Sequence, residues 1–208
     1  MLKALCESAS RFKNDIPRRS YGKRNFKYVV EISPTDGSFQ IHDFGRDGIE
    51  LSTPIRGDRS GSPSDENLKP YLLGDKAMYV LGIPDSAGQK RADLVHNGFI
   101  KVLLYVYRQT RRREIRCIYK LLKNDKFQKE IKKKRIRPND WIAFRADPTE
   151  YFYDNDKIAQ AWEKYLEKEC CAAEAECCIC GRTKKVLRIY PWQVSLMGQT
   201  CPISSLNA

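Results

Sequence analysis

Two cysteines near the end of the chain have the spacing of a zinc knuckle. Cys177 and Cys180 are two residues apart and are followed by Gly181, so a tight turn lets both thiolates reach one ion. A tetrahedral zinc site needs four ligands, and the sequence has no second Cys-x-x-Cys pair. The other candidate ligands are Cys170, Cys171 and Cys201, because Cys6 and Cys117 lie far off in sequence. Spacing alone leaves open both a zinc site and a metal-free turn with free thiols.

Catalytic motifs are missing from the sequence. It contains no Ser-His-Asp order, no Gly-rich phosphate loop ending in Gly-Lys and no His-Glu-x-x-His. Asp154 and Asp156 lie where a helix is expected to begin, a position at which aspartate is favoured as a cap. His96 has apolar and basic neighbours, so we interpret it, like His42, as a hydrogen-bonded structural histidine. We expect no catalysis.

Charged and polar groups gather in residues 56–71, where three basic residues are balanced by three acidic ones. We expect an exposed, mobile loop because Gly, Ser and Pro are frequent there. The basic residues that could neutralise phosphates are Arg56, Arg59 and Lys69. The residues that could reach base edges are Ser60, Asn67 and Tyr71. Solvated surface loops have a similar composition, so composition alone favours a loop without a ligand.

A second basic run, "KEIKKKRIR" at residues 129–137, has two equally supported interpretations. It could be a stripe that follows a phosphate backbone. It could also be a solvated helix end whose lysines interact favourably with the helix dipole.

The elements that must position these residues alternate between strand and helix patterns. Residues 26–44 predict a hairpin that turns at Thr35-Asp36-Gly37, and residues 141–147 ("WIAFRAD") predict a short strand. Helices are expected at residues 2–12, 92–106, 113–122 and 155–169. We therefore predict an α+β fold with a hairpin-containing N-terminal sheet, a helical middle and a mixed strand and loop C-terminal segment.

We treat residues 1–208 as one domain with three parts. These are a β-rich part at 1–90 that contains the 56–71 loop, a helical part at 91–169, and the thiol turn with a Gly-Gln-Thr segment at 170–208.

Composition and charge limit the partners and the compartment. The chain has 208 residues, is 41% hydrophobic and carries a formal net charge of +12, which suits partners that carry phosphate. No apolar run approaches the ~18 residues of a membrane-spanning helix, and the N-terminus lacks a signal-peptide core. We expect a cytoplasmic protein that does not bind membranes and whose eight cysteines are free or bind metal rather than forming disulfides.

Several segments, taken in order, resemble the large subunit of the type I-C CRISPR surveillance complex (Cascade). They are "RSGS…KPYLLGDKAMYVLGIP" (59–84), "R…VHNGF" (91–99), "WIAFRAD" (141–147), "CCICGRTKKVLRIYP" (177–191) and "GQTCPISSLNA" (198–208). The family's Pro-Tyr-Leu-Leu step, its Asp and its Tyr-x-x-Gly are matched by Pro70, Tyr71, Leu72, Leu73, Asp75, Tyr79 and Gly82. In its Cys-x-x-Thr-Gly turn, Cys180 replaces the threonine, so the turn can form without metal and zinc at Cys177 and Cys180 is not favoured. Family members are much longer, so the chain resembles an N-terminal portion.

The resemblance implies a subunit that recognises the motif flanking a DNA target (PAM) and helps to open the duplex. It favours DNA contacts in the 56–71 loop, and it adds Gln199 and Thr200 of the Gly-Gln-Thr segment as candidates. The implied partners are the double-stranded DNA target, guide RNA with the other Cascade subunits, and a separately recruited helicase-nuclease. No cofactor is implied.

Two alternatives remain at this point. One is a stand-alone zinc-binding protein that binds DNA or RNA. The other is a homologue that docks into Cascade without reading DNA, as an inhibitor or assembly partner would.

Overall fold

A computed structural model describes residues 20–56, 59, 68–147, 150–151, 155–176, 183–187, 193–196 and 199–202. The helix predicted at residues 2–12 lies outside this range, as does most of the predicted 56–71 loop.

The main sheet has the strand order β3-β2-β6-β5, and β7 adds to β6. Its strands are β2 (Tyr28–Ile32), β3 (Phe39–Asp43), β5 (Gly74–Lys76), β6 (Trp141–Asp147) and β7 (Glu150–Tyr151). β2 and β3 form the predicted hairpin, and Gly37 has the positive φ (75°) that such a turn requires. The central pair, β2 and β6, is parallel and joins segments more than a hundred residues apart in sequence. Their buried side chains form the middle of the core.

A second, two-stranded sheet leads into the candidate site. It pairs β1 (Tyr21–Phe26) with β4 (Ile49–Pro54) in antiparallel register, with Tyr21 opposite Pro54. β4 therefore ends immediately before the segment that the sequence predicts to contact DNA.

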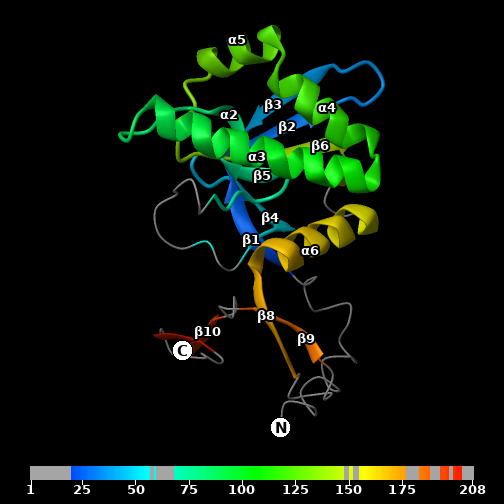
Figure 1. The fold of residues 1–208 in the computed structure, drawn as a ribbon. Helices are drawn as coiled ribbons and strands as arrows, with labels where there is room; N and C mark the ends of the chain where they lie inside the picture. Colours follow the sequence, from blue (N-terminus) through cyan, green and yellow to red (C-terminus); the bar gives the residue numbers. More distant parts are fainter. Residues whose placement is uncertain are drawn as a thin grey trace.

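Helices lie in front of the main sheet, above it and below it in the view of Figure 1. They are α2 (Ala77–Leu81), α3 (Gln89–Thr110), α4 (Arg113–Leu122), α5 (Asp125–Lys133) and α6 (Asp156–Cys170). The periodic apolar positions Val95, Phe99, Val102 and Val106 of α3 are fully or almost fully buried, as the pattern predicts. The predicted helices at 92–106, 113–122 and 155–169 are confirmed, and α4 has the predicted bounds.

The C-terminal segment contains two antiparallel strand pairs. β8 (Cys171–Glu176) pairs with β9 (Thr183–Leu187), and β10 (Gln193–Leu196) pairs with β11 (Gln199–Pro202). The predicted α+β class, with its sheet, helical middle and mixed C-terminal segment, is confirmed. Within the described residues, no helix is long and apolar enough to cross a membrane.

Candidate nucleic-acid interface

A buried aspartate organises the segment that follows β4. Asp75, at the centre of the short strand β5, has no exposed surface. Its carboxylate accepts hydrogen bonds from the backbone N–H groups of Tyr71 (2.8 Å) and Lys76 (2.7 Å). It also accepts a charge-assisted hydrogen bond from Nη1 of Arg59 at 2.7 Å. A residue from the predicted loop is thereby attached to the core sheet.

The guanidinium of Arg59 contacts two tyrosine rings in addition to Asp75. Its Cζ lies 4.5 Å from the ring centroid of Tyr71 and 4.2 Å from that of Tyr79 on α2. The Tyr71 ring has a further aromatic neighbour in Trp141, at 5.8 Å between centroids. Such cation–π contacts are strengthened when the cation is shielded from water. Arg59 therefore has a well-defined structural position.

Burial raises the pKa of the Asp75 carboxyl above its usual range, while the Arg59 guanidinium and the two N–H groups oppose that rise. A carboxyl whose pKa is raised by folding stabilises the fold below its unfolded pKa, and this stability is lost as the pH rises through the folded pKa. The charge state of Asp75 thus couples the site to pH.

We predict that Arg59→Met makes stability more sensitive to pH. Without the guanidinium, the Asp75 pKa should rise further, so the stability lost relative to wild type should grow as the pH increases from about 4 towards neutrality. Urea unfolding over a pH series measures this difference. Arg59→Lys, which keeps a positive charge, is the control and should show a smaller pH dependence. If Arg59→Met loses the same amount of stability at every pH, Arg59 does not lower the pKa of Asp75.

The two ends of the same segment are held by α6 and α3. Nε1 of Trp162 on α6 donates a hydrogen bond to the backbone oxygen of Ile55 at 3.3 Å. At the other end, Leu68 packs on α3 at Gly98, where a Cβ would lie 3.2 Å from Cδ1 of Leu68. The segment between β4 and β5 is thus fixed at Ile55, Arg59 and Leu68.

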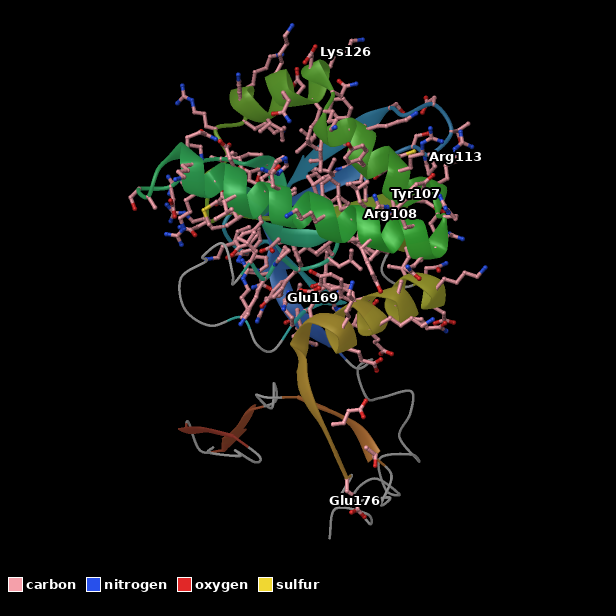
Figure 2. The ribbon with its side chains drawn as sticks, in the orientation of Figure 1. Tyr107, Arg108, Arg113, Lys126, Glu169 and Glu176 are labelled. Atoms are coloured by element: carbon pink, nitrogen blue, oxygen red, sulfur yellow. The ribbon has the colours of Figure 1, made fainter. Side chains whose placement is uncertain are left out.

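A hollow of about 430 Å³ opens between α3 and α6 beside the end of this segment. Leu68 and Pro70 border it, and the helices contribute the basic and aromatic side chains Lys101, Tyr105, Arg108 and Tyr165. Lys101 and Arg108 are exposed. Figure 2 shows Arg108 towards the end of α3 and Glu169, which also borders the hollow, at the end of α6. Lys101 and Arg108 are not among the contacts predicted from the sequence, although their seven-residue spacing on one helix face could have indicated them.

The sequence matches a known protein family over almost its whole length. A family model described as CRISPR-associated protein (Cas_Csd1) matches residues 2–207. The chain belongs to the Csd1 family of CRISPR-associated proteins. No curated protein matches it. The resemblance to a CRISPR protein is therefore confirmed at the level of the family.

In this Csd1-family chain, the predicted DNA contacts occupy different environments. Arg59 and Tyr71 are brought together around Asp75, and Tyr71 is only 5% exposed. Arg56 is also 5% exposed, and Lys69 is half-buried. Direct contact of Arg59 or Tyr71 with DNA remains a prediction that requires these side chains to leave the arrangement described above.

The structure describes two of the four remaining predicted DNA contacts. Ser60 and Asn67 lie outside the described residues. Gln199 and Thr200 lie on β11, opposite Leu196 and Ser195 of β10.

Both histidines of the Csd1-family chain have structural hydrogen bonds. Nδ1 of His96 lies 3.0 Å from the backbone oxygen of Tyr79, and Nε2 of His42 lies 3.2 Å from the carboxylate of Glu31. Glu31 is also bound by Arg145 at 2.8 Å. These contacts agree with the structural interpretation of the two histidines.

The thiol turn connects two paired strands. Cys177 and Cys180 lie outside the described residues, but the flanking residues Glu176 and Thr183 are opposite each other in the β8–β9 ladder. Backbone pairing can bring the ends of such a turn together without a metal ion.

We predict that the Csd1-family chain does not need zinc to fold. Native mass spectrometry should show at most substoichiometric zinc, and Cys180→Thr should leave the melting temperature unchanged because the β8–β9 ladder closes the turn. Cys117→Ser, a change at a thiol on α4, is the control for loss of a cysteine. One tightly held zinc ion per chain would show that the prediction is wrong.

Proposed function

We propose that the chain is part of the large subunit of a type I-C surveillance complex, in which it recognises the duplex motif beside the DNA target. Membership of a CRISPR-associated family supports this proposal, as does the net charge of +12. In such complexes base pairing with the guide RNA reads the target, and the protein reads a short flanking duplex. The partners are the DNA duplex, the guide RNA with the other subunits, and a recruited helicase-nuclease that cuts. The chain acts in the cytoplasm, by binding and without a metal cofactor.

The observation that carries the proposal is the anchoring of the segment between β4 and β5. A recognition loop must hold its contacts in a fixed geometry if it is to discriminate between base pairs. The buried Asp75 fixes Arg59 and the backbone of Tyr71, and the end of the segment borders a hollow with exposed basic groups. In this account Arg59 and Tyr71 position the segment, which brings its other polar groups to the DNA.

The remaining residues divide into two roles. Lys69, Lys101 and Arg108 are suited to phosphates, because a lysine or arginine on a phosphate carries no sequence information. Gln199 is suited to a base edge, because an amide both donates and accepts. Contact with the flanking duplex at these groups lowers the cost of separating the first base pairs for the guide RNA.

Single substitutions in the assembled complex test these roles. Lys69→Ala and Lys101→Gln should weaken binding to all duplexes by a similar factor, whereas Gln199→Ala should reduce the preference for the correct motif by about 1 to 3 kcal/mol. Lys90→Gln, a change at an exposed lysine on the same helix as Lys101 but not in the hollow, is the matched control. If all of these variants keep both affinity and preference, the chain docks in the complex without reading DNA, and the proposal is wrong.

A further inference from the structure

Most of the excess positive charge lies in one compact part of the fold. Residues 111–137, which include α4 and α5, contain 13 Lys and Arg residues against 3 Asp and Glu residues, a net charge of +10 in a chain whose total is +12. The rest of the chain is therefore close to neutral. Within this part, α4 and α5 contain seven Lys and Arg residues against three Asp and Glu residues, and the other six basic residues lie in the segments that flank and join them.

The charges form two rows on the outer side of the helices. We call the following six residues the α4–α5 face: Arg113, Arg116 and Lys120 on α4, and Lys126, Lys129 and Lys132 on α5. All six are exposed, and they lie opposite the buried apolar positions of the same helices, Ile115, Ile118, Leu122, Phe127 and Ile131. None of the six forms an ion pair within the described part of the chain. Figure 2 shows Arg113 and Lys126 on this pair of helices, with Lys126 well away from Glu169 at the hollow.

The arrangement of these charges disfavours the helices themselves. Arg113 and Lys126 lie in the first turns of α4 and α5, where the helix dipole disfavours positive charge. Arg116 and Lys120 form a like-charged pair at i, i+4, which also destabilises a helix. Favourable interaction with the helix dipole explains Lys120 at the C-terminus of α4 and Lys132 at that of α5, but it does not explain the first turns. A bound anion would offset the stability that these charges cost the helices.

The face is held rigidly. The Asn124 side chain accepts hydrogen bonds from the N–H groups of Lys126 (2.9 Å) and Phe127 (3.2 Å) and so caps α5 directly after α4. A guanidinium nitrogen of Arg113 donates to the backbone oxygen of Thr35 at 3.3 Å, which ties α4 to the hairpin turn.

Two hollows with basic rims adjoin the face. One, of about 530 Å³, lies between Phe39 and the α5 lysines, and Glu130 on its rim is paired with Lys133 at 2.6 Å. The other, of about 430 Å³, lies between α4 and the hairpin turn and includes Asp36. Hydrogen bonds from Ser33 and Ser38 lower the pKa of Asp36 to about 2, so its rim carries one negative charge among three positive ones.

The chemistry of the face fits a duplex backbone better than a single strand. Proteins that bind single strands stack the bases on aromatic side chains. On these helices Phe127 is buried on the side opposite the face, and the ring of Tyr119 is covered by Lys123, whose Nζ lies 4.5 Å from the ring centroid. Among the described residues the exposed large hydrophobic side chain is Phe44, which follows β3 and lies on neither helix. The face thus offers positive charge without an exposed aromatic ring. Phe39, in the adjoining hollow, is half-buried and packs edge-on against Phe127.

We propose that the α4–α5 face binds the phosphate backbone of the duplex DNA beside the target. The inference rests on the proposed function for the presence of that duplex, and it adds a second contact surface that holds the duplex without reading its sequence. Its contribution to affinity is electrostatic, so it depends steeply on salt.

The test compares two triple variants of the full chain in the assembled complex. Lys126→Gln with Lys129→Gln and Lys132→Gln removes three charges from the face. Lys90→Gln with Lys157→Gln and Lys164→Gln removes three exposed lysines from α3 and α6 and is the matched control. The first triple variant loses neighbouring like charges that repel one another, so the melting temperature of this variant should not fall.

The probes are a DNA duplex without a target, the same duplex with the flanking motif, single-stranded DNA and an RNA duplex. The first variant should bind both DNA duplexes more weakly, with a salt slope reduced by roughly 0.9 for each phosphate that is no longer neutralised, while its motif preference is unchanged. The control triple should keep the wild-type slope. If the wild-type complex shows no preference for the duplex with the flanking motif, that result counts against the proposed function.

Three results would overturn the inference. They are equal slopes for the two triple variants, a loss of affinity confined to single-stranded DNA or to duplex RNA, and failure of the first variant to assemble with guide RNA and the other subunits.

Discussion

Replacing Asp75 with alanine is expected to lower the free energy of unfolding by about 3 to 5 kcal/mol. The substitution leaves the Arg59 guanidinium next to two tyrosine rings without its counter-charge. It also leaves the N–H groups of Tyr71 and Lys76 without an acceptor. A buried donor that loses its partner retains the full cost of desolvation. Urea denaturation followed by circular dichroism measures the change.

Two further substitutions separate charge from position. Asp75→Asn keeps an acceptor of similar size but loses the charge, so we expect a smaller loss of stability than for alanine. Asp93→Ala removes an exposed carboxylate on α3 and should change stability by no more than about 0.5 kcal/mol. If Asp75→Ala is as mild as Asp93→Ala, Asp75 does not organise this site.

Replacing Trp162 with alanine should have an effect of similar size, about 3 to 5 kcal/mol. The indole is fully buried, stacks on Tyr165 with 5.5 Å between ring centroids, and donates to the oxygen of Ile55. The cavity left by the missing indole would loosen α6 and release the start of the segment between β4 and β5. Urea denaturation measures the stability, and amide hydrogen exchange at the end of β4 reports the local release.

Trp162→Phe is the matched control, because it keeps an aromatic ring but removes the N–H donor. It should cost less than alanine and should still increase exchange near Ile55, since the hydrogen bond to Ile55 is absent in this variant. Unchanged exchange at the end of β4 in both variants would mean that α6 does not anchor the segment.

Local patterns in the sequence predicted much of the fold. The Asp36-Gly37 turn and the alternation around it specify the β2–β3 hairpin, because the backbone conformation of the turn depends on these residues themselves. The bounds of α4 follow from its apolar period and from the turn at Arg111 and Arg112.

Long-range pairings could not be predicted in the same way. The parallel pairing of β2 with β6 depends on the whole chain lying between them, and no local pattern encodes it. The strand β5 has three residues, too few for a periodic signal, and its register with β6 places Asp75 opposite Ile142 in the core.

Long-range contacts also explain why Arg59 and Tyr71 are interpreted from the sequence as nucleic-acid contacts. In the sequence, Arg59 and Tyr71 are a basic and an aromatic residue in a polar segment, which is the composition of a nucleic-acid contact. Their partner Asp75 lies 16 residues after Arg59, and its burial is a tertiary property. Tyr79 is indicated by the family resemblance alone. A charge pair between a predicted loop and a predicted core strand is a signal that could be sought in other sequences.

Photo-crosslinking from the flanking motif tests the central claim most directly. A photoreactive base would be placed in the motif of a target duplex, the assembled complex irradiated, and the crosslinked peptides identified by mass spectrometry. The account predicts crosslinks to this chain in residues 56–71 and around Lys101 and Arg108. Crosslinks found solely in other subunits, with this chain present in the complex, would contradict it.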